Sequence, residues 1–149
     1  MKKTFVSGVV VVCVAAMASA IAADDSFKCK ARNDLVGSCW KVHGRLRVGN
    51  GNPATRIWPI GTKRLLGVQD EDFGNDEESA EPAEIRKYGF TAQIFADFIV
   101  CPLTKEKPGE MQIVCISGAK NIHVEKWLDR NLNEIKPVWF TVPDVSEKK

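Results

Sequence analysis

The sequence has five cysteines, of which Cys13 lies in a leader that we expect to be removed. The other four supply the clearest chemistry: Cys29, Cys39, Cys101 and Cys115. An even number of cysteines in a short exported chain is typical of two disulfides, each of which stabilises a fold by about 2–4 kcal/mol. Three connectivities are possible, and closeness along the chain favours Cys29–Cys39 with Cys101–Cys115. No C-x-x-C or paired-histidine spacing is present, so we expect no metal site and no cofactor.

Two histidines and two tryptophans are the candidate binding residues. His43 and His123 fall on the polar side of alternating segments, and two histidines without a third ligand make a poor metal site. Trp58 and Trp127 are the tryptophans that we expect to be exposed, where their rings would stack on a sugar or a peptide. No residue is assigned a catalytic role. The S-x-x-K letters at 117–120 lack the S-D-N and K-T-G elements of penicillin-recognising acyl transferases.

Short apolar alternations, separated by Gly, Pro and Asn, must position these side chains. Residues 40–48 place apolar and polar side chains on opposite faces, which predicts a half-buried strand, and Asn50-Gly51-Asn52-Pro53 predicts a reversal. Ser117-Gly118 predicts a second reversal, between two strands of a hairpin. The remaining segments are a short helix at 82–88 and strands at 54–60, 63–69, 91–103, 110–116, 120–127 and 138–142. About seven short strands favour an antiparallel β-sandwich over a barrel.

An acidic stretch interrupts this pattern at residues 70–84, with eight Asp or Glu and no Lys or Arg. Such a run is typical of a solvated loop. Asp70, Asp72, Asp76 and Glu81 have the spacing of positions 1, 3, 7 and 12 of a calcium loop, but position 6 is Asn75 where the sharp turn needs Gly. Because four positions match, a calcium-stabilised adhesion-type domain remains an alternative despite the mismatch at position 6.

The start of the chain predicts where the protein works. Lys2-Lys3, an uncharged run and small residues before Ala22 are typical of a secretory signal peptide at residues 1–22. Cleavage would leave residues 23–149 as one domain without a membrane span, in the periplasm or outside the cell. Removing two of the 21 basic residues would balance them against the 19 acidic ones. A neutral chain does not suggest a nucleic-acid partner.

Several motifs resemble a family of small uncharacterised secreted bacterial proteins. The matching runs are 39–46, 50–53, 56–68, 97–103 and 108–112. More distantly, the order V-x-G-x-L, N-G-x-P, R-I-W, D-F-x-V and P-G-E is similar to transthyretin-like and carboxypeptidase-regulatory-like domains. That resemblance implies a seven-stranded Greek-key sandwich. One branch hydrolyses 5-hydroxyisourate with His and Arg residues and a C-terminal Tyr-Arg-Gly-Ser, whereas this chain ends in Ser-Glu-Lys-Lys.

Together, these patterns predict an all-β, disulfide-containing Greek-key β-sandwich, transthyretin-like or Ig-like. Its expected function is that of a non-catalytic binding or envelope-accessory module. The expected partner is an envelope protein, a peptide or a glycan. A small secreted hydrolase or metal-dependent enzyme, built from residues distant in the sequence, is the other alternative.

Overall fold

Alternation of buried and exposed side chains defines the strands in the computed structural model, which describes residues 29–69, 81–129 and 131–146. Strand β1 (Trp40–Val48) buries Leu46 and exposes Lys41 and His43, which confirms the half-buried strand expected there. The other strands are β2 (Thr55–Pro59), β3 (Leu66–Val68), β4 (Ala92–Pro102), β5 (Gln112–Leu128), β6 (Glu134–Val142) and β7 (Val145–Ser146). The helical segments are α1 (Ala83–Arg86) and the single turns η1 (Cys29–Ala31) and η2 (Gly89–Thr91).

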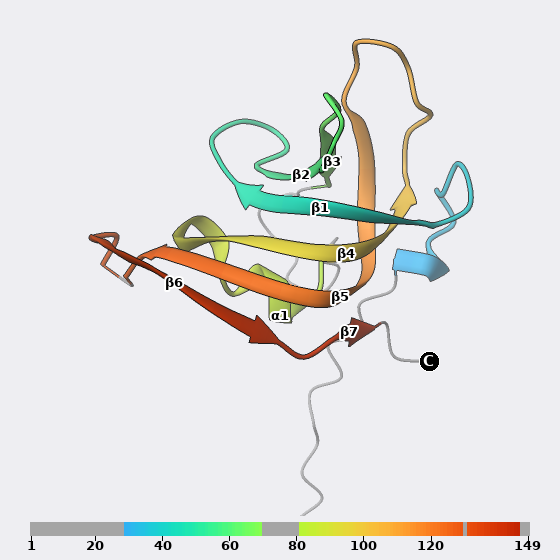
Figure 1. Ribbon diagram of the computed structural model, residues 1–149. Coiled ribbons are helices and arrows are strands. Elements are labelled where there is room, and N and C mark those ends of the chain that lie inside the picture. The colour runs from blue at the N-terminus through green and yellow to red at the C-terminus, as the bar shows by residue number, and fades with distance from the viewer. Residues whose placement is uncertain (1–28, 70–80, 130, 147–149) are drawn as a thin grey trace, which may run out of the picture.

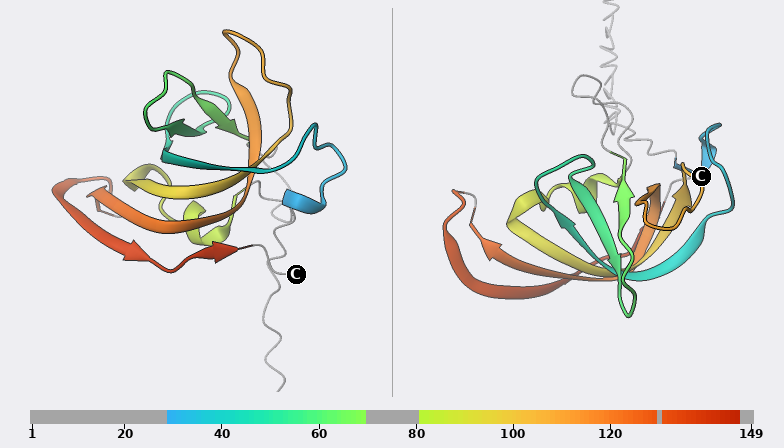
Figure 2. Two further views of the ribbon diagram at one scale, coloured as in Figure 1. Left: turned by 45° about the vertical axis from the view of Figure 1, so that its right-hand side comes forward. Right: turned by 90° about the horizontal axis from the view of Figure 1, so that it is seen from above.

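All seven strands belong to one sheet, in the order β3-β2-β1-β4-β5-β6, with β7 also paired to β5. Strand β3 runs parallel to the beginning of β5, and this pairing joins the two ends of the β3-β2-β1-β4-β5 series. Those five strands therefore close into a barrel, visible as the curled sheet in the right-hand view of Figure 2. Strand β6 pairs with the second half of β5 and extends away from the barrel (Figure 1).

The core lies inside this closed sheet. Its largest side chain is Phe98 of β4, which is completely buried together with Ile57 of β2. The short helix α1 contributes Ile85, which is also buried, and the ring of Tyr88 contacts Phe140 of β6 at 5.8 Å. The described part of the β3–β4 connection, residues 81–91, thus covers part of the sheet on its inner side.

The all-β, mostly antiparallel class with seven strands is confirmed. The sandwich that we expected would divide the strands into two facing sheets, whereas the strand pairing places all of them in one sheet. The closing β3–β5 pair joins the strands into one sheet. The reversal expected at Ser117-Gly118 is wrong, because β5 runs without interruption through both residues. Gly118 is instead a point of close approach: a Cβ there would lie 2.8 Å from the backbone oxygen of Val145 in β7.

The cysteines form two disulfides, but the expected connectivity is wrong. Cys29 is bonded to Cys115, and Cys39 to Cys101. Each bond therefore ties the segment before β1 to the β4–β5 hairpin, instead of closing a short local loop. The expected pairing failed because nearness in the sequence does not report which strands become neighbours.

Several sequence predictions concern residues outside this description. They include the signal peptide at 1–22 and most of the acidic loop at 70–84, with three of the four carboxylates of the calcium spacing. The helix expected at 82–88 is present as α1, and the last strand begins earlier than expected, at Glu134. In the part of the chain that the structure describes, no helix has the length and apolar character needed to cross a membrane.

Candidate functional site

The candidate site is the outer face of the sheet, where the polar halves of the strands meet. Antiparallel register places Arg45 of β1 opposite Trp58 of β2 on one side and opposite Phe95 of β4 on the other. Further along the same row, Phe95 lies opposite His123 of β5, and His123 lies opposite Thr141 of β6. Four strand spacings of about 4.8 Å make this row about 19 Å wide.

Arginines and a tryptophan line a hollow of about 260 Å³ at the β1–β2 end of this face. The guanidinium carbon of Arg45 lies 4.6 Å from the centre of the Trp58 ring, a cation–π distance. The indole N–H of Trp58 donates to the backbone oxygen of Thr62 at 2.8 Å, which fixes the ring while leaving 43% of the residue exposed. The hollow is lined by Arg45, Arg47, Gly49, Asn50, Ala54, Arg56, Trp58 and Leu65. We call this hollow the arginine–tryptophan groove.

Arg56 is held in place by the turn between β1 and β2. Its Nε donates to the backbone oxygen of Pro53 at 3.0 Å, and its Nη2 donates to that of Asn50 at 3.1 Å. Among the described residues, Arg45, Arg47 and Arg56 have no carboxylate within ion-pair distance. The groove therefore presents positive charge that those residues do not neutralise, and part of that charge is positioned by backbone carbonyls.

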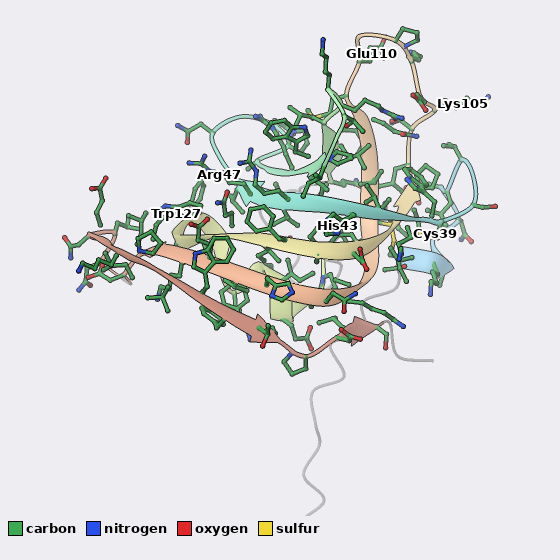
Figure 3. All side chains as sticks on the ribbon, viewed as in Figure 1. Cys39, His43, Arg47, Lys105, Glu110 and Trp127 are labelled. Carbon is green, nitrogen blue, oxygen red and sulfur yellow. A yellow bond between two sulfur atoms is a disulfide. The ribbon has the colours of Figure 1, made fainter. Side chains whose placement is uncertain are left out.

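A second hollow, of about 540 Å³, adjoins the groove and shares Arg56 and Leu65 with it. It lies between the β2–β3 connection and the loop from β4 to β5, which carries Lys105 and Glu110 in Figure 3. Four of its charges are paired: Arg64 lies 2.9 Å from Glu106, and Lys107 lies 3.3 Å from Glu110. Lys63 and the shared Arg56 have no carboxylate within ion-pair distance among the described residues, so this hollow has two such cations and the groove has three.

Aromatic rings continue across the same face towards β6. The Phe95 ring stacks on Trp139 with 5.6 Å between centroids. Arg47 lies 5.2 Å from the Trp127 ring, and Figure 3 shows Arg47 on β1 and Trp127 near the end of β5. Trp139 is 56% exposed. Aromatic rings therefore extend from Trp58 on β2 to Trp139 on β6, whereas the guanidinium groups lie on β1 and β2.

A hydrogen-bonded cluster around Asp97 lies further along the face. Asp97 Oδ1 is 3.0 Å from His43 Nδ1, and its Oδ2 accepts from Asn121 Nδ2 at 2.9 Å. The Nζ of Lys41 lies 3.5 Å from the same Oδ2. These bonds, first that from Asn121 and then that with His43, hold the pKa of Asp97 below its usual value. Asn121 reaches Asp97 from an irregularity in the β4–β5 register, where its φ is 52°.

The structure brings the four candidate binding residues onto one face but does not join them into one pocket. Trp58 is exposed as expected, while Trp127 is half-buried under Arg47. His43 and His123 are both exposed, and they lie on β1 and β5 with β4 between them. They do not form a common histidine cluster. Asp97 lies inside β4, which is paired with β1 on one side and β5 on the other.

Sequence reasoning missed the arginines of the groove and the exposed Trp139. Arg45 and Arg47 belong to the polar half of the β1 alternation, so their outward direction was readable. Their position opposite Trp58 and Arg56 depends on the β1–β2 register, which no local pattern specifies. Among the described residues, one group of three potential metal ligands is present, Cys29, Cys101 and Cys115. Their sulfurs are in disulfides, so they offer no thiolate to a metal.

Comparison with protein-family models, with curated proteins and with solved structures found no match to this chain.

Proposed function

We propose that this protein is an exported, non-catalytic binding module whose ligand is an acidic polysaccharide held in the arginine–tryptophan groove. The observation that carries the proposal is the presence of three arginines around an exposed tryptophan ring, with no carboxylate partner among the described residues. A guanidinium group binds carboxylate and sulfate-like anions with two parallel hydrogen bonds. The flat face of an indole ring packs against the apolar face of a sugar.

The width of the outer face favours a polymer over a small ligand. The second hollow and the Phe95–Trp139 stack extend the surface on both sides of the groove. Strand connectivity offers independent support: three consecutive strands, a fourth beside the first, and closure of the sheet into a barrel are similar to the OB-fold. OB-fold barrels bind oligosaccharides and oligonucleotides beside their β1–β2 and β4–β5 loops, although a fold alone assigns no ligand.

Export and overall charge favour a glycan over a nucleic acid. The two disulfides are compatible with an oxidising compartment, and residues 1–22 have the pattern of a secretory leader. Basic and aromatic side chains also bind single-stranded nucleic acid, but the chain without its leader carries equal numbers of basic and acidic residues. We place the protein in the periplasm or outside the cell, where acidic polysaccharides are accessible to it.

The hydrolase alternative receives little support from the His43–Asp97 pair. A histidine oriented by a carboxylate is one half of a nucleophilic site, but in the described residues no serine, threonine or cysteine side chain is hydrogen-bonded to His43. The pair also lies on an open strand surface rather than in either hollow. We therefore interpret Asp97 as a structural carboxylate that orients neighbouring side chains.

Titration calorimetry with the disulfide-intact protein tests the proposal. Polygalacturonate, a uronic-acid polymer, should bind, whereas neutral dextran should not. Arg45→Gln and Arg47→Gln together should weaken binding by at least tenfold, since hydrogen bonds to charged groups contribute about 1.5–3 kcal/mol each. Arg86→Gln removes an exposed arginine on α1 outside the groove and is the matched control.

Three results would contradict the proposal. They are equal binding of dextran and polygalacturonate, equal weakening by Arg86→Gln, and tighter binding of a single-stranded oligonucleotide than of either polysaccharide. The last result would indicate that the groove binds a nucleic acid instead of a polysaccharide.

Trp58→Phe should retain more affinity for polygalacturonate than Trp58→Ala, because the aromatic stacking face is reduced in the first variant and removed in the second.

A further inference from the structure

The two disulfides meet at one point in the β4–β5 hairpin. Cys101 and Cys115 are directly opposite each other in the antiparallel register, and each is bonded to a cysteine of the segment before β1. The sulfur atoms of Cys29, Cys101 and Cys115 all lie within 4.8 Å of one another. The Cys101 sulfur of one disulfide is therefore close to both sulfurs of the Cys29–Cys115 disulfide.

A bond between Cys101 and Cys115 fits the backbone as it stands. Opposed residues of an antiparallel pair have Cα atoms about 4.5–5.5 Å apart, which falls within the range of about 4.4–6.8 Å found for disulfides. The strands need not separate to form it. The alternative connectivity, Cys101–Cys115 with Cys29–Cys39, thus requires rearrangement mainly in the segment before β1.

Exposure decides where an external thiol can begin. Cys29, Cys101 and Cys115 are buried, with 2%, 0% and 0% of their surface exposed. Cys39 is partly exposed and follows the exposed residues Gly37 and Ser38. Figure 3 labels Cys39 near the beginning of β1. Because thiol–disulfide exchange requires access to the sulfur under attack, Cys39 is the site for that attack.

We propose that the disulfides form a thiol-catalysed switch, in which an external thiolate converts the Cys29–Cys115 and Cys39–Cys101 bonds into Cys101–Cys115 and Cys29–Cys39. The external thiolate attacks Cys39, breaks the Cys39–Cys101 bond and leaves Cys101 as a thiolate. Cys101 then attacks Cys115, and Cys29 leaves as a thiolate. Finally, Cys29 attacks Cys39 in the mixed disulfide and releases the external thiolate. Two disulfides are present before and after, so the sequence needs no oxidant or reductant.

The switch would release the segment 29–39 from the barrel. In the structure, this segment is held by both disulfides and by the hydrogen bond from Val36 N to Pro102 O at 2.9 Å. After exchange, its bonds are internal, and β4 and β5 are linked only to each other. The same barrel would therefore exist with its N-terminal segment either bonded covalently to the β4–β5 hairpin or held there only by noncovalent contacts, such as the packing of Leu35 against the core.

Disulfide mapping of the intact protein tests this proposal. The native protein is incubated with substoichiometric glutathione at pH 8, quenched by acid and alkylation, and mapped by mass spectrometry of peptides prepared without reduction. Peptides linked through Cys101–Cys115 and Cys29–Cys39 should accumulate together while near-ultraviolet circular dichroism remains native. Appearance of Cys29–Cys101 with Cys39–Cys115 in similar amount would indicate scrambling in unfolded chains and would overturn the proposal.

Two single variants test the central step without an external thiol. Cys39→Ala leaves Cys101 free beside the Cys29–Cys115 bond, and Cys29→Ala leaves Cys115 free beside the Cys39–Cys101 bond. Both variants should converge on the same Cys101–Cys115 bond, with the released thiol on Cys29 or Cys39, respectively. If each folded variant keeps its remaining native bond at pH 8, the proposed exchange does not occur.

Discussion

Replacing the disulfides one at a time by alanine pairs should reveal that their stabilising effects overlap. The ring closed by Cys39–Cys101 spans 62 positions and lies inside the ring of 86 positions closed by Cys29–Cys115. In the chain-entropy relation, isolated rings of these sizes contribute about 4.3 and 4.6 kcal/mol. With the inner bond intact, the outer bond closes only the remaining positions, about 24, and contributes about 3.5 kcal/mol. The pair together therefore contributes about 8 kcal/mol.

Urea unfolding at one temperature measures these contributions. Removal of either bond should lower the free energy of unfolding by about 3–3.5 kcal/mol, since the other bond still restricts the unfolded chain. Removal of both should leave the chain largely unfolded in water, because about 8 kcal/mol is comparable to the whole stability of a small domain. A double-pair variant that unfolds cooperatively within about 2 kcal/mol of the parent would refute this reasoning. A loss below about 1 kcal/mol for either single pair would do the same.

Three further predictions follow from packing and charge. Phe98→Ala should lower the free energy of unfolding by about 3–5 kcal/mol, measured by urea unfolding, because the side chain is completely buried. Gly118→Ala should cost about 1–3 kcal/mol and increase amide exchange in β7, whose backbone oxygen lies 2.8 Å from the new Cβ; Gly49→Ala, with open space around it, should show neither effect. The lowered pKa of Asp97 stabilises the folded state above about pH 4, and this contribution is lost as pH falls through the folded pKa. The stability difference between the parent and Asp97→Asn should therefore shrink between pH 6 and pH 3, and a difference independent of pH would contradict the assigned bonds.

Local patterns predicted the strands that alternate cleanly. Strand β1 was expected at 40–48 and occupies Trp40–Val48, because one face of it is buried and the other is not. The reversal at 50–53 is likewise present between β1 and β2. Strand β5 was predicted as two strands because Ser117-Gly118 has the composition of a turn. Gly118 allows β7 to approach β5 closely, and the local sequence around Gly118 does not reveal such a contact between distant segments.

Site and disulfide predictions failed where they depended on register. The alternation at 40–48 places Arg45 on the polar face, and Trp58 was expected to be exposed. Their stacking on each other, however, follows from the pairing of β1 with β2. Cys101 and Cys115 were expected to be bonded to each other, and they are opposed in the β4–β5 register without being bonded. That they bond to other cysteines depends on where the segment before β1 crosses the hairpin. The distance between two residues in the sequence carries no information about that crossing.

Closure of the barrel also bears on how the protein avoids aggregation. Pairing of β3 with β5 removes two sheet edges, and within the described chain β6 becomes the outermost strand of the sheet order. An open strand edge is a template for intermolecular pairing, and Val138, Trp139 and Phe140 make this one apolar. Pro137 has no backbone N–H, so it interrupts the row of hydrogen-bond donors along β6. The charged residues Glu134 and Lys136 precede it in the same strand and oppose pairing with another chain. The edge that remains is therefore a poor seed for fibres, although it is the one open strand edge that the sheet order leaves beside β5 in the described chain.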